Sequence, residues 1–413
     1  MKSNDEQIIK KLAGDGLNFL KKERKKLSKE IVFYQETYFP CKDRFVNLYW
    51  VEIEKKKLKF ALVISPKKKP LIEITRKFGY PNKKLLVAIN ASNFYLSDNG
   101  RKPQIYPYNL CINNGRVLQF PSNDRITLIE KNGKISLRFL TAEGKIKIGN
   151  KYFRWIGATN YNNRKKKSLS SSEVVIWGLA DIRFTYIPDS KRRAKKPITQ
   201  TTYVNCPQGK LLLGVNLNKE GKPYISKKNV KKLSLLDYAF ICMVKKSVGR
   251  KIKKGEIVKL VSVNNFKVKK GCNAVSLGFT LPKQFKEIKN TLVKEVRKSP
   301  EGIVRPIEKD FMKSWSVILF AGSKVIFFLV DSFPFKKNQT GLNIYELHKL
   351  LSKKFNFTEA AVCDAGQSSK ICIKKNEEYQ VFGNLHYIDF TGPKPKWNGI
   401  NGRAITSALI AYY

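Results

Sequence analysis

Short apolar runs separated by charged turns make up most of this sequence. β-branched and aromatic residues dominate the runs, and few of the runs are long enough to form a helix. The clearest runs lie at 45–53, 59–65, 126–130, 134–140, 174–177 and 257–263. We expect the first two of these to pair as strands around the turn at 54–57. The pattern as a whole predicts a β-rich protein with few helices.

The longest apolar stretch, from 317 to 330, predicts a buried hairpin. The segment 321–324, with the sequence Ala-Gly-Ser-Lys, divides it into two strand-length runs around a Gly-Ser turn. Neither run is long enough to cross a bilayer as a helix, so we expect no transmembrane segment.

One segment has clear helical periodicity. Leu347, Leu351 and Phe355 recur at a spacing of four residues and therefore fall on one face of a helix. Asn343 and Glu346 fit a capping box at its start, because the side chain of each can bond the backbone N–H of the other. The sequence predicts a helix from Asn343 to about Phe355.

The first 40 residues differ from the rest in being rich in Lys, Glu and Leu. Apolar residues such as Ile8, Leu12 and Leu27 have loosely helical spacing, which Gly14 and Gly16 interrupt. This predicts a basic helical N-terminal arm over 1–40, followed by a main domain over 41–413. The arm could pack on the main domain as a solvated appendage, or it could dock on nucleic acid or a larger assembly.

The charge balance points to a polyanionic partner or substrate. Of 413 residues, 81 are Lys or Arg and 32 are Asp or Glu, so the net charge is +49. Self-repulsion of this size weakens a compact state and favours adhesion to polyanions. Hydrophobic residues make up 42% of the chain, enough for a substantial core, so a disordered basic tail is excluded. Basic loops are expected near 162–172 and 190–200. Codon usage in an AT-rich genome could supply part of the lysine excess.

Cysteine and histidine usage excludes several classes of site. Seven cysteines occur without a Cys-x-x-Cys pair, which argues against a zinc site and against a complete disulfide framework. No signal peptide is apparent, so we expect a reducing compartment or a virion assembled in one. His348 and His386 are the only histidines, too few for a multi-histidine metal site, and His348 is expected to be a packing or surface residue. The sequence predicts no metal site and indicates no particular cofactor.

Three apolar runs end in polar residues that could carry chemistry. The run at 85–89 ends in Asn90, the run at 325–330 ends in Asp331, and the run at 360–363 ends in Asp364. An Asp at a strand end often caps its own turn. With so few histidines, acid and base work would fall to carboxylates, which is the chemistry of glycosidic cleavage.

Several short motifs, in this order along the chain, match those of a known family. Residues 88–94 read Ala-Ile-Asn-Ala-Ser-Asn-Phe, and 330–333 read Val-Asp-Ser-Phe. Residues 341–347 read Gly-Leu-Asn-Ile-Tyr-Glu-Leu, and 363–369 read Cys-Asp-Ala-Gly-Gln-Ser-Ser. An Arg and a last strand close the chain at 402–410. From about residue 43 to the end, the sequence resembles the phosphodiester glycosidase domain, which includes the enzyme that removes N-acetylglucosamine from a phosphodiester on lysosomal glycoproteins.

The resemblance implies an α+β fold with a strongly bent, mixed or antiparallel sheet and an active cleft at the strand ends. It implies cleavage of the bond between a sugar anomeric carbon and a phosphate, in a polyanionic glycan. Asp364 and Asp331 would be the catalytic residues. The residues implied for substrate binding are Asn90, Asn93, Gln367, Ser368, Ser369 and Arg403.

The sequence also departs from the family pattern. Lys-Ser-Trp-Ser at 313–316 replaces His-Pro-Arg-Thr, and Asp-Ser-Phe at 331–333 replaces Asp-Gly-Arg, so two arginines are absent. Ala-Gly-Gln at 365–367 replaces three glycines and adds Cβ atoms. A second hypothesis follows from these changes and from the charge. The domain could be a pseudoenzyme, a catalytically degenerate scaffold that serves as a basic structural or nucleic-acid-binding component of a virion or ribonucleoprotein.

Overall fold

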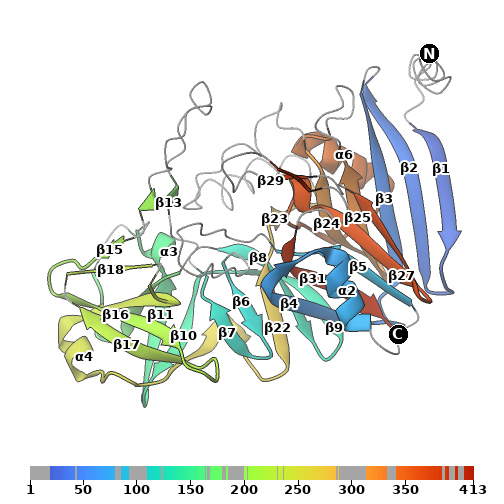
Figure 1. Cartoon of the computed structure of the whole chain (residues 1–413). Coiled ribbons are helices and arrows are strands. Elements are labelled where there is room, and N and C mark those ends of the chain that lie inside the picture. The colour runs from blue at the N-terminus through green and yellow to red at the C-terminus, as the bar shows by residue number, and fades with distance from the viewer. Residues whose placement is uncertain are drawn as a thin grey trace.

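The computed structural model is built mainly of β-strands with few helices, as the sequence predicts (Figure 1). It describes residues 19–41, 44–79, 85–92, 109–121, 124–162, 164, 168–178, 183–184, 200–201, 203–229, 231–235, 237–284, 287, 313–332, 341–383, 387–389, 396–398 and 404–413.

A seven-stranded sheet forms one end of the molecule. Its order is β1-β2-β3-β25-β24-β26-β23, and all of its neighbouring strands are antiparallel. The strands are β1 (Phe19–Lys26), β2 (Ile31–Cys41), β3 (Arg44–Glu54), β23 (Phe279–Thr280), β24 (Trp315–Ala321), β25 (Lys324–Asp331) and β26 (Glu359–Val362). Helix α6 (Ile344–Lys354) packs on one face, where Leu347 and Leu351 meet Trp50 and Phe328.

A second sheet, the β5 sheet, faces the other side of the seven-stranded sheet. Its order is β28-β27-β5-β31-β4, from β28 (Glu378–Gly383), β27 (Lys370–Lys375), β5 (Leu85–Asn90), β31 (Ile405–Tyr412) and β4 (Lys59–Lys69). Val87, Ile89 and Leu409 share one hydrophobic core with Ile318 and Phe327 of the seven-stranded sheet. Helix α2 (Leu71–Gly79) covers the outer face of the β5 sheet, so the two sheets lie between two helices (Figure 1).

A third sheet, the β8 sheet, joins this body to the rest of the molecule. Its order is β7-β6-β22-β8-β9, from β6 (Cys111–Asn113), β7 (Arg116–Gln119), β8 (Arg125–Lys131), β9 (Lys134–Leu140) and β22 (Cys272–Ser276). Alternate residues point to opposite faces of a strand. Leu128 and Val275 therefore enter the core between the first two sheets, while Ile129 and Ala274 enter a second core.

The second core belongs to an eight-stranded sheet at the opposite end (Figure 1). Its order is β17-β16-β19-β12-β11-β10-β20-β21. The strands are β10 (Glu143–Ile148), β11 (Lys151–Gly157), β12 (Glu173–Trp177), β16 (Lys210–Leu217), β17 (Pro223–Asn229), β19 (Phe240–Lys245), β20 (Val258–Val263) and β21 (Phe266–Lys267).

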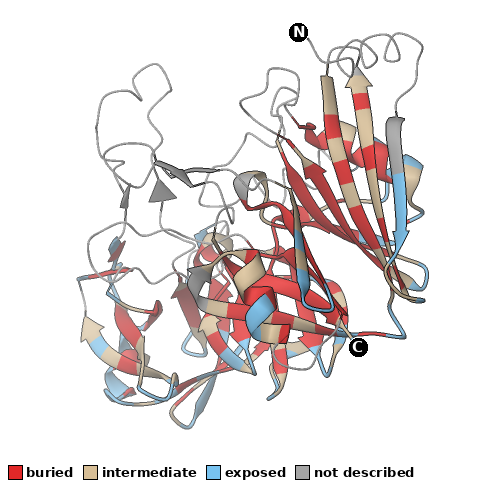
Figure 2. Ribbon diagram, turned by 45° about the vertical axis from the view of Figure 1, so that its right-hand side comes forward, coloured by how far each residue is buried: buried red, intermediate tan, exposed pale blue. Residues whose placement is uncertain are grey.

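The remaining elements are α3 (Ala158–Asn162), α4 (Lys246–Lys251), the 3-10 turn η6 (Gly366–Ser368) and the short strands β13 (Arg183–Phe184), β14 (Gln200–Thr201), β15 (Tyr203–Asn205), β18 (Lys232–Ser234), β29 (Tyr387–Asp389) and β30 (Lys396–Asn398). The buried residues lie mainly on the strands of the sheets (Figure 2).

The predicted helical arm over 1–40 is wrong in its described part. Residues 19–26 and 31–41 form β1 and β2, which extend the seven-stranded sheet from β3. Ile31 and Phe33 alternate into the core, a spacing of two that suits a strand. Pairing with β3 overrides the helix propensity of the Lys and Glu residues. Residues 1–18 lie outside the described residues.

The predicted pairing of 45–53 with 59–65 is also wrong, although both segments are strands. β3 pairs with β2 and β25, whereas β4 pairs with β31 in the other sheet. Two predictions are confirmed. β24 and β25 form the hairpin across 317–330, and α6 has Asn343 as its N-cap with the capping box to Glu346.

Two other predictions concern loops and membrane spans. The predicted basic loop at 162–172 contains the end of α3 and a described stretch at 168–172, whereas residues 190–199 lie outside the described residues. Across the described ranges, no helix has both the length and the apolar character needed to cross a membrane.

Candidate functional site

Six strand termini meet at one edge of the two facing sheets. β24 runs antiparallel to β25 and β26, so the start of β24 lies beside the ends of its two neighbours. In the β5 sheet, β27 and β31 run antiparallel to β5, so both begin where β5 ends. The edge therefore gathers the three strand ends that the sequence singles out, at Asn90, Asp331 and Asp364. We call the polar residues at this edge the strand-end cluster: Asn90, Lys313, Ser314, Ser316, Asp331, Ser332, Asp364, Ser368, Ser369, Lys370 and Thr406.

Asn90 ties the two sheets together at this edge. Its Nδ2 donates to the backbone oxygen of Asp364 at 2.6 Å, while its Oδ1 accepts from Ser316 Oγ at 2.6 Å and from the backbone N of Lys370 at 3.0 Å. The side chain is fully buried. Asn90 therefore cross-links the two sheets through three hydrogen bonds, and its contact with substrate stays a prediction of the resemblance.

Asp364 lies beside a lysine. Its backbone N donates to Ala91 O at 2.8 Å, which places it at the junction of the two sheets. Its side chain is half-buried and interacts electrostatically with Lys313, whose ammonium lies 4.4 Å from the centre of the Trp315 ring. Burial lowers the pKa of Lys313 to about 8, and the charge of Asp364 opposes that shift. The charge of Asp364 thus favours the charged form of Lys313, against the effect of burial.

Gly341 holds the backbone of Lys313 in place. Lys313 and Leu342 exchange two backbone hydrogen bonds of 3.2 Å, just before α6 begins. Gly341 has a φ of +91°, and a Cβ at this position would lie 2.4 Å from Lys313 O. Only glycine suits both this conformation and this close approach.

Asp331 is the second carboxyl group at the edge. It is half-buried at the end of β25, opposite Asn47 of β3. Burial raises the pKa of Asp331 to about 7, against the opposing effect of a hydrogen bond from the backbone of Ser332. Burial raises the pKa of Tyr49 to about 12, and the negative charge of Asp331 adds to this shift. A fraction of the Asp331 side chains thus keeps its proton at neutral pH.

A pair of buried serines connects the surroundings of Asp331 to those of Asp364. Ser314 Oγ lies 2.7 Å from Ser332 Oγ and accepts from the backbone N of Ser332 at 3.1 Å. The backbone oxygen of Ser314 accepts from Gly366 N at 2.9 Å, in the turn that follows Asp364. Ser314 also adjoins Lys313 in sequence. The residues next to both carboxyl groups therefore meet at this serine.

Three buried hydroxyls of the cluster have no hydrogen-bond partner in the described part of the chain. They belong to Ser368, Ser369 and Thr406, and all three residues are fully buried. Leaving a buried hydroxyl unpaired costs about 1 to 3 kcal/mol. A bound ligand or ordered water would supply the missing partner.

The remaining predicted site residues are Asn93, Gln367 and Arg403. Asn93 and Arg403 lie outside the described residues, as does His386, and nothing is described of the Gln367 side chain. The prediction for His348 is confirmed. It is buried in α6, its Nε2 lies 2.7 Å from Pro282 O, and burial lowers its pKa.

Sequence reasoning missed two lysines. Lys313 lies in the segment Lys-Ser-Trp-Ser at 313–316, where the resemblance would lead one to expect an arginine, and the lysine itself is the local signal of a cation. Lys370 is fully buried at the start of β27, next to the unpaired hydroxyls of Ser368 and Ser369. The β27 sequence Lys-Ile-Cys-Ile-Lys-Lys gives no local signal that its first lysine is buried. The described residues contain no group of three His, Cys, Asp or Glu side chains placed to hold a metal ion.

Comparison with known proteins bears on the fold alone. No family model matches the sequence, and no curated protein matches it significantly. A hypothetical protein from Synechocystis is similar in structure, with a TM-score of 0.55 and 12% identity over 95% of this chain and 64% of that protein. A protein from Burkholderia pseudomallei K96243 has a TM-score of 0.51 and 12% identity, over 92% of this chain and 76% of its own. This chain thus spans less than two thirds of the Synechocystis protein, and what it shares with both proteins is the β-rich fold.

Proposed function

We propose that this protein hydrolyses the bond between a sugar anomeric carbon and the phosphate of a phosphodiester, as its resemblance to the phosphodiester glycosidase domain implies. One observation carries the proposal. Asp364, balanced by Lys313, lies at the same sheet edge as Asp331, whose pKa is raised to about 7. Glycosidic cleavage commonly uses two carboxyl groups, one as an acid and one as a base or nucleophile.

The two carboxyl groups would take different roles. Asp331, protonated on part of the molecules at neutral pH, would donate its proton to the departing phosphate oxygen as the bond to the anomeric carbon breaks. Asp364 would stay ionised beside Lys313 and would accept a proton from the water that attacks that carbon. The products would be the free sugar and a phosphate monoester.

The phosphate group would be bound by cations and hydroxyls. The ammonium of Lys313 is a point charge suited to a phosphate oxygen, and it stands in for the arginine that the family has in this segment. The buried hydroxyls of Ser368 and Ser369 would find their hydrogen-bond partners in the substrate or in waters that it orders. The net charge of +49 would concentrate a polyanionic glycan around the molecule.

The test is hydrolysis of a panel of sugar-1-phosphate methyl diesters by the full chain. We expect the unaltered protein to release free sugar and Asp364→Asn to release it at least about 100-fold more slowly, because general acid or base groups contribute factors of this size. Asp237→Asn, at an exposed position before β19, is the matched control. Release from no diester, or equal rates for the two variants, would contradict the proposal.

A second candidate function is a catalytically inactive role as a nucleic-acid-binding component of a large assembly such as a virion or ribonucleoprotein. The distribution of charge favours it. The segment from 203 to 254, which forms much of the eight-stranded sheet, has 13 basic residues and two acidic ones. Binding to phosphates through many lysines would weaken steeply with added salt.

A further inference from the structure

The outer face of β10, β11 and β20 is a basic surface with an aromatic residue in it. Ile146, Phe153 and Leu260 point into the core beneath these strands. Alternate residues point outward, because side chains along a strand alternate between faces. The outward residues, which we call the β10 face, are Lys145, Lys147, Tyr152, Arg154 and Lys259.

Tyr152 forms a cross-strand row with two lysines. It pairs with Lys147 of β10, and Lys147 pairs in turn with Lys259 of β20. The ring is 64% exposed, and the ammonium of Lys147 lies 5.5 Å from its centre. A face of the Tyr152 ring is thus accessible and can stack on a planar group.

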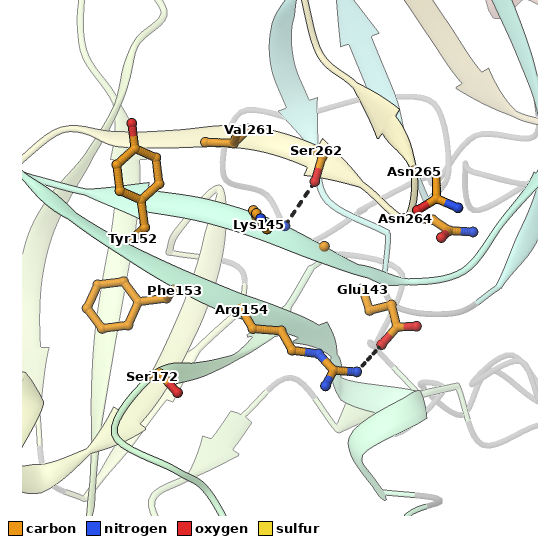
Figure 3. A pocket seen from close by; sticks show the side chains of 11 residues that line it. Glu143, Lys145, Tyr152, Phe153, Arg154, Ser172, Val261, Ser262, Asn264 and Asn265 are labelled. Atoms are coloured by element: carbon orange, nitrogen blue, oxygen red, sulfur yellow. Dashed lines mark hydrogen bonds and ion pairs between the residues drawn. The ribbon is translucent and has the colours of Figure 1, made fainter.

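A hollow of about 690 Å³ adjoins this row (Figure 3). Tyr152 and Arg154 line it from β11, and Asn264 and Asn265 line it from the turn after β20. The two amides offer both hydrogen-bond donors and acceptors. The hollow therefore combines a stacking ring with groups that can bond the edge of a planar polar ring.

The lysines of this face have no acidic partners among the residues that the structure describes. The one carboxylate that lines the hollow belongs to Glu143, and it pairs with Arg154 at 2.7 Å. Lys145, Lys147 and Lys259 form no ion pair with any residue that the structure describes. Three unpaired cations on one exposed face attract a polyanion.

The basic surface continues along β20 to a second hollow. This hollow measures about 320 Å³, and its lining includes Arg116, Lys259 and Lys222, which pairs with Glu220 at 2.6 Å. Residues 257–260 of this segment line the second hollow, whereas Val261 and Ser262 line the first. The two hollows thus follow one strand, which suits an extended polymer better than a compact ligand.

We propose that the β10 face binds single-stranded nucleic acid, with a base stacked on Tyr152 and phosphates held by Lys145, Lys147 and Lys259. Outward residues on one strand are roughly 6.8 Å apart and strands about 4.8 Å apart, so the cations can follow an extended backbone. A duplex hides its base faces and would leave Tyr152 unused, whereas aromatic platforms in positive grooves are how single strands are bound without sequence preference. This inference is independent of the proposed hydrolysis, and it rests on the second candidate function, to which it assigns a surface.

The test compares two probes of equal charge on the full chain. The first is a fluorescent 20-mer of thymidylate, and the second is the corresponding abasic 20-mer, which has the same phosphates without bases. We expect Tyr152→Ala to bind the thymidylate 20-mer about 5- to 100-fold more weakly and to bind the abasic 20-mer unchanged, because stacking on one aromatic residue has an effect of this size. Tyr152→Phe should keep the affinity, since its ring still stacks.

Tyr203→Ala is the matched control. Tyr203 is 54% exposed on β15, and the ammonium of Lys232 lies 4.6 Å from its ring centre, so the two tyrosines have similar surroundings in different places. Equal affinities of the Tyr152→Ala and Tyr203→Ala variants would overturn the inference. Equal losses for both probes would also overturn it, because the surface would then bind polyanions without reading bases. If the unaltered protein binds neither probe, the second candidate function fails as well, whereas the proposed hydrolysis does not depend on the result.

Discussion

The strand-end cluster and the β10 face use polar side chains in opposite ways. In the strand-end cluster most polar groups are buried, and Asn90 alone makes three hydrogen bonds between the two sheets. On the β10 face the lysines are exposed or half-buried and form no ion pair within the described ranges. Burial strengthens each interaction and shifts pKa values, which is what catalysis needs. Exposure keeps the side chains solvated and adaptable, which suits contact with a polymer backbone.

The comparison predicts that the largest single effect on stability comes from Asn90. Asn90→Ala would leave Ser316 Oγ, Lys370 N and Asp364 O without their partner at a buried junction. We expect a loss of about 2 to 5 kcal/mol in the free energy of unfolding, measured by urea denaturation. Asn160→Ala, which removes one half-buried hydrogen bond to Asp124, should cost about 1 kcal/mol. Equal losses for the two variants would mean that Asn90 is not the link between the sheets.

The next effect concerns binding of the phosphate by Lys313. Lys313→Met should raise KM for a sugar-1-phosphate diester about 10- to 100-fold, because a charged hydrogen bond to phosphate is lost. Lys313→Arg should retain most of the affinity. Lys324→Met is the control, since Lys324 pairs with Glu52 at the other end of the same hairpin. A KM unchanged by Lys313→Met would remove Lys313 from the site.

Asp331 should make stability depend on pH. Its folded pKa of about 7 lies above the ordinary value of 3.8, so the folded state binds the proton more tightly than the unfolded state does. Stability should therefore fall as the pH rises from about 4 to 7. Asp331→Asn should flatten this slope and stabilise the protein at pH 8 by about 1 to 3 kcal/mol, allowing for partial exposure. Thermal unfolding at pH 5 and pH 8 measures the difference, and an unchanged slope would show that Asp331 is solvated.

The smallest effect belongs to the exposed lysines. Replacing Lys145, Lys147 and Lys259 together by Ala should reduce the slope of log affinity against log salt by about 2 for a single-stranded 20-mer, since each phosphate contact contributes about 0.7. The control replaces Lys55, Lys56 and Lys57, which are exposed at the turn after β3. If both triple variants reduce the slope equally, the whole basic surface attracts the nucleic acid without a preferred site, and the β10 face has no special role.

Local patterns predicted local structure well. The hairpin across 317–330 and the capped helix after Asn343 depend on neighbours in sequence, so their signals lie within the segments themselves. β3 and β4 are strands as predicted, but their partners β25 and β31 come from the far end of the chain. No local pattern specifies the pairing of β3 with β25 or of β4 with β31. The described part of the N-terminal arm pairs with its sequence neighbours instead, so there the Lys- and Glu-rich composition favoured a helix although Ile31 and Phe33 alternate as in a strand.

The sequence predicted which strand-end residues lie at the candidate site better than it predicted what each of them does there. The three strand ends at Asn90, Asp331 and Asp364 do meet, because the antiparallel order of both sheets brings them to one edge. That Asn90 is a cross-link depends on burial, which its position after an apolar run only suggested. The interaction of Lys313 with Asp364 joins residues 51 positions apart in the sequence, so no local pattern indicates it.

The pH dependence of kcat/KM for a sugar-1-phosphate diester tests the central claim most directly, with the unaltered protein and Asp331→Asn compared. We predict that the rate of the unaltered protein falls as the pH rises through about 7, where Asp331 loses its proton, and that Asp331→Asn loses both this limb and most of the activity. Sugar release that is absent at every pH, or a profile that Asp331→Asn leaves unchanged, would contradict the account.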